Sequence, residues 1–189
     1  CNVRNILFSL SMPVSIGLFC LSKEVLFIVN GEEYVAGATS LKILSLALPW
    51  AIMSCFFVNA ILIPNRKEKK SLIATITAAV LNIVINIFLI PIFGAAGAAI
   101  TTLIAEALVC ILSKYYSVDI FKDKFELKIV VSVLLGCLWI LGVCCITEKY
   151  IINTLERVIL DIIISSSGYM LILVISKNPI IMLFHNRKK

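Results

Sequence analysis

The feature that most constrains this chain is a run of 35 uncharged residues, from Ser71 to Ala105. Soluble domains rarely carry such a run, because their surface helices keep a charged or polar face toward water. Of the 189 residues, 61% are hydrophobic and 15% are charged, against about 45–50% and about 25% in soluble domains. The mean hydropathy is +1.07. These values exclude a disordered or water-soluble chain and predict an all-α polytopic membrane bundle.

Charged residues divide the chain into about six apolar segments, each long enough to cross a bilayer as a helix of about 20 residues. The 35-residue run is too long for one crossing. We therefore expect two helices, 71–92 and 95–113, separated by a tight turn near Pro91 and Gly94. The stretch 114–127 is either a connecting loop or a short amphipathic helix on the membrane surface. The other expected spans are 5–22, 43–65, 129–147 and 158–176.

Lysine and arginine residues lie in short clusters between these spans. Six spans place both termini on one side of the membrane, and 13 of the 17 cations then lie on that side. The positive-inside rule predicts that this side is the cytoplasm, so the chain is expected to be a multi-pass protein of the cytoplasmic membrane. The net charge of +6 is explained by this topology, and no nucleic acid partner is expected.

Polar side chains within the spans are the candidate functional residues. Glu106 lies eleven residues into its span, about 16 Å from the outer end, where an ionisable group is costly and indicates a function. Asn82 and Asn86 share one face of the preceding span, and Asn82 is expected at the depth of Glu106. Asn82 and Glu106 either form a hydrogen bond that holds the hairpin together or act in a polar cavity or an ion-coupling step. Lys42, near the outer mouth of its span, either snorkels to the interface or attracts an anionic head group.

The sequence shows no catalytic, cofactor or metal site. His185 is the one histidine, so histidine-based metal sites and Ser–His catalysis lack their parts, and no nucleotide-binding glycine motif occurs. We therefore expect neither enzyme activity nor a cofactor. Gly94, Gly97, Ala98, Thr101 and Ala105 form a stripe of small residues that allows another helix to approach closely.

The segment from Leu81 to Glu106 contains two asparagines four residues apart, followed by Ile-Pro-Ile-Phe-Gly-Ala-Ala-Gly. This segment resembles the C-terminal lobe of the polysaccharide flippases. These are the O-antigen (Wzx-like) transporters of the MOP superfamily, which also contains lipid II flippases and MATE exporters. Asn30–Tyr34, Leu41–Leu44 and the basic loop Arg66–Lys70 fit the same family. The resemblance is best over residues 13–113.

The resemblance implies one lobe of a MATE-like two-lobe transporter. Residues 1–127 would form this lobe, 128–176 an additional transmembrane hairpin and 177–189 a basic cytoplasmic tail. The implied activity is translocation of an undecaprenyl-diphosphate-linked oligosaccharide repeat unit across a bacterial cytoplasmic membrane by alternating access.

The family members carry two lobes, and this chain begins at Cys1 without an initiator methionine. A missing N-terminal lobe is therefore the expected protein partner, besides the lipid-linked oligosaccharide and the bilayer. Asn82, Asn86, Glu106 and Lys42 are the candidates for lining the cavity. An ion-coupled multidrug exporter, a lipid II exporter and a non-transporting membrane scaffold fragment are the alternatives.

Overall fold

The computed structural model describes residues 2–122, 126–151 and 153–176. Within these residues there is no strand, and six helical segments are long and apolar enough to cross a membrane. The chain is therefore an all-α polytopic membrane protein, as the sequence predicts. It divides into two compact units, one made of Cys1–Ala36 with Lys124–Lys189 and the other of Gly37–Asp123. The predicted basic tail, 177–189 with His185, lies outside the described residues.

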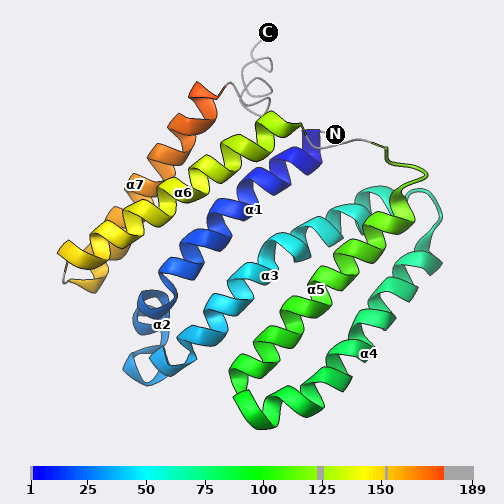
Figure 1. Ribbon diagram of the computed structural model, residues 1–189, viewed down its shortest axis with the longest axis horizontal. Helices are drawn as coiled ribbons and strands as arrows, with labels where there is room; N and C mark the ends of the chain where they lie inside the picture. Colours follow the sequence, from blue (N-terminus) through cyan, green and yellow to red (C-terminus); the bar gives the residue numbers. More distant parts are fainter. Residues whose placement is uncertain (1, 123–125, 152, 177–189) are drawn as a thin grey trace. The chain divides into compact units, whose positions relative to one another are not determined.

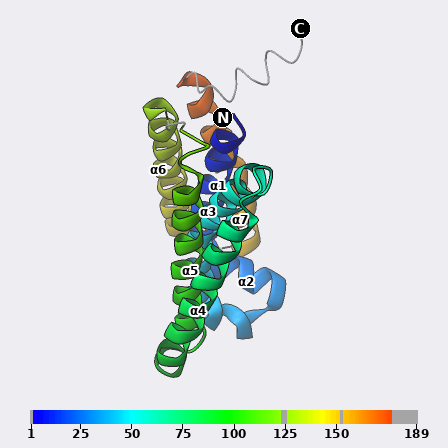
Figure 2. The same ribbon diagram turned by 90° about the vertical axis from the view of Figure 1, so that its right-hand side faces the viewer.

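The unit Gly37–Asp123 contains three spans. α5 packs against both α3 and α4 and lies between them in Figure 1, and Figure 2 shows α4 and α5 side by side. Only Ala74 and Ala78 of α4 are fully buried among the described residues, so most of the α4 surface is available to lipid or to a partner. The spans are α3 (Ala38–Phe56), which continues into the π-helix η2 (Phe57–Leu62), α4 (Glu68–Phe93) and α5 (Ala95–Ser117).

A single residue, Gly94, separates α4 from α5. Its backbone angles, φ 56° and ψ −131°, lie where a side chain is disfavoured. Pro91 lies inside the last turn of α4, so the helix ends at the glycine and not at the proline. Just beyond the turn, a Cβ atom at Gly97 would collide with the carbonyl oxygen of Leu89. The predicted small-residue stripe therefore brings the two backbones into contact.

The other unit combines the start and the end of the described chain. α1 and α7 both pack against α6. Ile129 and Val133 of α6 are fully buried and, with Cys137, pack against Phe8 of α1. The elements are α1 (Asn2–Cys20), α2 (Ser22–Asn30), the 3-10 helix η1 (Glu32–Gly37), α6 (Leu127–Tyr150) and α7 (Thr154–Ile175).

A proline in α1 gives rise to one of the tertiary contacts of this unit. Pro13 has no amide N–H, so the carbonyl oxygen of Ser9, one turn earlier, lacks its helical donor. The Tyr169 hydroxyl of α7 donates to this oxygen at 2.6 Å. The Tyr169 ring lies against Gly136 of α6, where a Cβ atom would overlap the ring. Thus α7 supplies the hydrogen bond that α1 cannot form, and α6 makes room for it.

The six predicted spans are confirmed, and the differences lie at their ends. Residues 114–117, predicted to belong to a linker, form the last turn of α5. Residues 118–120 form a turn rather than a surface helix. In the structure, the first span belongs to the same compact unit as the last two spans. The family resemblance instead groups the first span with the spans that end at residue 113. The lobe boundary at 127 stays a prediction.

Candidate functional site

Three polar side chains form a ladder inside the α4–α5 hairpin. Asn86 donates to Asn82 Oδ1 at 2.7 Å, one turn away on α4. Thr101 of α5 donates its hydroxyl to Asn86 Oδ1 at 2.6 Å. Thr101 is buried, whereas Asn82 and Asn86 are half-buried. No acceptor among the described residues engages the amide N–H groups of Asn82, so they can donate to a ligand or to another chain.

Glu106 of α5 lies at the depth of Asn82, but it is on a different face of α5 from Thr101, which contacts α4. The Thr101–Asn86 contact sets the register of the antiparallel hairpin, and this register puts Glu106 within one residue of the level of Asn82. Five helical residues turn through about 500°, so Glu106 points about 140° away from Thr101. The predicted Asn82–Glu106 hydrogen bond is not formed among the described residues, because depth does not fix direction. Glu106 instead shares its stripe with Ala99, Cys110 and Ser113, which are buried.

Lys42 lies on a third helix. It follows the start of α3 at Ala38 by four residues, and its side chain is half-buried. The Ser45 hydroxyl donates to the backbone carbonyl oxygen of Lys42 at 2.7 Å. The four candidates therefore fall into three places, with Asn82 and Asn86 on α4 as the one pair that the structure brings together.

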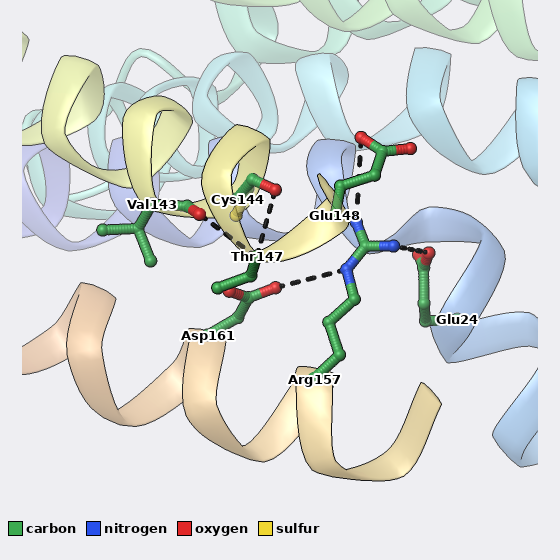
Figure 3. A network of polar contacts seen from close by, with 7 residues as sticks. All are labelled: Glu24, Val143, Cys144, Thr147, Glu148, Arg157 and Asp161. Carbon is green, nitrogen blue, oxygen red and sulfur yellow. Dashed lines mark hydrogen bonds and ion pairs between the residues drawn. The ribbon is translucent and has the colours of Figure 1, made fainter. Parts of the chain in front are cut away.

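A charged cluster in the other unit was not predicted from the sequence (Figure 3). Arg157 Nη1 of α7 donates to Glu24 Oε1 of α2 at 2.8 Å, and Arg157 Nε lies 3.7 Å from Asp161 Oδ2. Arg157 Nη2 is 3.9 Å from Glu148 Oε2 of α6. One guanidinium thus faces three carboxylates from three helices. The sequence did contain an indication of this cluster, since Glu24, Glu148 and Arg157 all lie near span ends on the same predicted side of the membrane.

Asp161 is the least satisfied member of this cluster. Its side chain is 1% exposed, and neither carboxylate oxygen has a hydrogen-bond partner among the described residues. Asp161 also lines a cavity of about 600 Å³ between α1 and α7, to which α6 contributes Ile140 and Cys144. The buried hydroxyls of Ser9 and Ser165, which likewise lack partners, line the same cavity. Its other walls are mostly aliphatic, a composition typical of small-molecule sites.

The chain matches none of the protein-family models and none of the curated proteins with which it was compared. The six spans, the asparagine ladder and the Asp161 cavity are therefore the features that bear on its function.

Proposed function

We propose that this chain is one lobe of a transporter that moves an undecaprenyl-diphosphate-linked oligosaccharide repeat unit across the bacterial cytoplasmic membrane, for surface polysaccharide synthesis. Two features support the proposal: the resemblance of residues 13–113 to the polysaccharide flippases, and the six apolar spans. A second lobe, the lipid-linked oligosaccharide and the bilayer are the partners.

The observation that carries the proposal is the polar ladder on a mostly apolar hairpin. Asn82 and Asn86 are half-buried near the middle of α4, a helix that is largely exposed. Asn86 is paired within the ladder, whereas the N–H groups of Asn82 meet no acceptor among the described residues, and unpaired amide groups that face hydrocarbon cost free energy. Such amides need polar cover, and the hydroxyl groups of a sugar supply both donors and acceptors. A second lobe facing α4 would make the ladder one wall of a polar cavity.

In this proposal the lobe works by alternating access and performs no covalent step. Two lobes rock about a central site, which opens first to one side of the membrane and then to the other. The sugar head group passes along the polar wall while the polyprenyl tail stays in the bilayer. The close contact of α4 and α5 at Gly97 suits a hairpin that moves as one body.

The substitution Asn82→Leu tests the ladder in the complete two-lobe transporter. We expect it to abolish polysaccharide export in a strain that lacks its own flippase, at a normal membrane level. Thr77→Val is the matched control, because Thr77 is exposed on the same helix and bonds only the backbone carbonyl oxygen of Ile73, at 2.8 Å. Normal export by the Asn82→Leu protein would contradict the proposal.

The substitution Glu106→Gln separates a packing role from a role in transport. Glutamine keeps the size and shape of the side chain and one acceptor oxygen, replaces the other oxygen by an NH2 donor and removes the charge. We expect export to survive, because Glu106 shares its stripe with buried packing residues. Loss of export at normal expression would assign the carboxylate to substrate or ion passage.

An ion-coupled exporter of hydrophobic cations is the second candidate, and the cavity beside Asp161 favours it. Asp161 is buried next to aliphatic walls, has no hydrogen-bond partner among the described residues and faces Arg157 Nε at 3.7 Å, so a cation with an apolar body would have to share this carboxylate with Arg157. Under this alternative, Asp161→Asn should abolish the efflux of such a cation from cells. Under the first proposal, the same variant should leave polysaccharide export intact.

A further inference from the structure

The start of α4 and the end of α5 lie at one end of the unit Gly37–Asp123 (Figure 1), and these two segments are rich in basic residues. Two contacts hold the two segments together. Lys67 Nζ lies 3.7 Å from Asp119 Oδ2, and Lys70 Nζ lies 5.6 Å from the centroid of the Tyr116 ring. Among the described residues, the group, here called the basic end, has six cations, Arg66, Lys67, Lys69, Lys70, Lys114 and Lys122, and two carboxylates, Glu68 and Asp119.

Four of these cations are available to a ligand. Arg66, Lys69, Lys114 and Lys122 are exposed, and none of them makes an ion pair within the described part of the chain. Lys67 and Lys70, by contrast, are half-buried and engaged in the contacts above. The exposed cations therefore form a positive surface, and the contacts of Lys67 and Lys70 hold the two segments of this surface together.

An apolar stripe runs along α4 directly from Lys69. Leu72, Ile73, Ile76 and Val80 follow Lys69 at helical spacings and are between 52% and 59% exposed. Lys114 has the same arrangement on α5, with exposed Ile111 one turn deeper in the span. The positive surface thus adjoins an exposed apolar stripe, and an amphiphile with an anionic head group and an acyl chain matches both parts.

We propose that the basic end binds the head group of an acidic phospholipid. Arg66 and Lys69 contact the phosphodiester, Lys114 adds to the attraction, and an acyl chain lies along the α4 stripe. Each basic residue beside a membrane helix raises the affinity for anionic head groups roughly five-fold. Tyr115 and Tyr116, whose ring centroids are 5.6 Å apart, lie at this level as interfacial aromatic residues do. The site does not depend on what the protein transports.

Lipid binding to the full chain tests the proposal. The chain is purified in detergent, and binding of dioleoyl-phosphatidylglycerol is measured by native mass spectrometry, with dioleoyl-phosphatidylcholine as the neutral probe and inorganic phosphate as competitor. We expect phosphatidylglycerol to bind more tightly, salt to weaken its binding, and phosphate at equal concentration not to displace it. Arg66→Gln/Lys69→Gln/Lys114→Gln should lower its affinity on the order of 100-fold.

The control triple variant, Lys23→Gln/Lys128→Gln/Lys149→Gln, removes the same charge from exposed positions in the other unit. It should keep the affinity of the original chain. Equal binding of the two phospholipids, equal losses in the two triple variants, or displacement by phosphate alone would each overturn the proposal. If the first triple variant is not recovered from membranes, Arg66→Gln and Lys69→Gln singly should each weaken binding about five-fold, and unchanged affinity in both would overturn it.

Discussion

Single residues in this protein complete hydrogen bonds that the helices alone cannot make. Pro13 deprives the Ser9 carbonyl oxygen of its helical donor, and Tyr169 replaces it from α7. Ser9 is 2% exposed and Tyr169 is 6% exposed, so water does not reach this carbonyl in place of the hydroxyl. A buried polar group left without a partner costs about 1–3 kcal/mol.

Removal of the Tyr169 hydroxyl should therefore destabilise the chain. We expect Tyr169→Phe to lower the free energy of unfolding by about 1–3 kcal/mol. In a Pro13→Ala background, residue 13 regains an N–H that can donate to Ser9, so the same substitution should cost less. Thermal unfolding in detergent of the four proteins of this double-mutant cycle measures the difference. An equal cost in both backgrounds would mean that the proline does not create the need for Tyr169.

Arg157 forms ion pairs with Glu24 and Asp161, and all three side chains are largely buried. Its side chain is 11% exposed, and that of Glu24 is 13% exposed. Arg157→Met should lower stability by about 3–5 kcal/mol, because it leaves buried carboxylates without a counter-charge. Glu24→Gln added to this variant should recover part of the loss. Lys149→Met is the control, since Lys149 is exposed at the end of α6, and it should change the melting temperature little.

At the scale of elements, glycines set how closely α6 and α7 approach. Gly136 of α6 faces the Tyr169 ring, and Gly168 of α7 faces the Trp139 indole. The Trp139 Nε1–H donates to the carbonyl oxygen of Ile164 at 3.4 Å, so the indole bridges the two helices. Both glycines lie where an added methyl group would overlap an aromatic ring.

Alanine at these positions should separate the two helices. We expect Gly136→Ala and Gly168→Ala each to lower stability by about 1–3 kcal/mol, the usual cost of overpacking. Gly142, also in α6, has open space where a methyl group would lie, with no atom within 4 Å. Gly142→Ala should leave stability unchanged or raise it by up to about 1 kcal/mol, because alanine favours helix. Equal effects at positions 136 and 142 would show that helix propensity, and not the contact, governs both.

At the scale of the whole molecule, the distribution of charge predicts how the chain crosses the membrane. From the excess of lysine and arginine, we expect Arg66–Lys70 in the cytoplasm, together with both termini. Glu33, in the 3-10 helix η1 before α3, is then expected outside.

Cysteine labelling tests this topology in a background without the seven natural cysteines. An impermeant maleimide applied to intact cells should label Glu33→Cys and leave Lys69→Cys unlabelled until the membrane is opened. Both positions are exposed, so the reagent can reach either one from its own side. Labelling of Lys69→Cys in intact cells would reverse the predicted orientation.

The sequence by itself determined the number of spans and their approximate ends. Hydropathy and charge are local properties, and a helix that crosses a bilayer needs a nearly uncharged run of fixed minimum length. The same reasoning divided the 35-residue run at Gly94, and the rise per residue placed Asn82 and Glu106 at one depth.

The tertiary structure decided what each polar side chain meets. Depth along a helix says nothing about direction around it, so the sequence could not show that Glu106 turns away from the Asn82–Thr101 ladder. The Glu24–Arg157 pair and the Tyr169–Ser9 bond join residues 133 and 160 positions apart. Such pairs depend on which helices pack together. The spans of this chain are almost uniformly apolar, so the pattern of hydropathy does not specify which helices are neighbours.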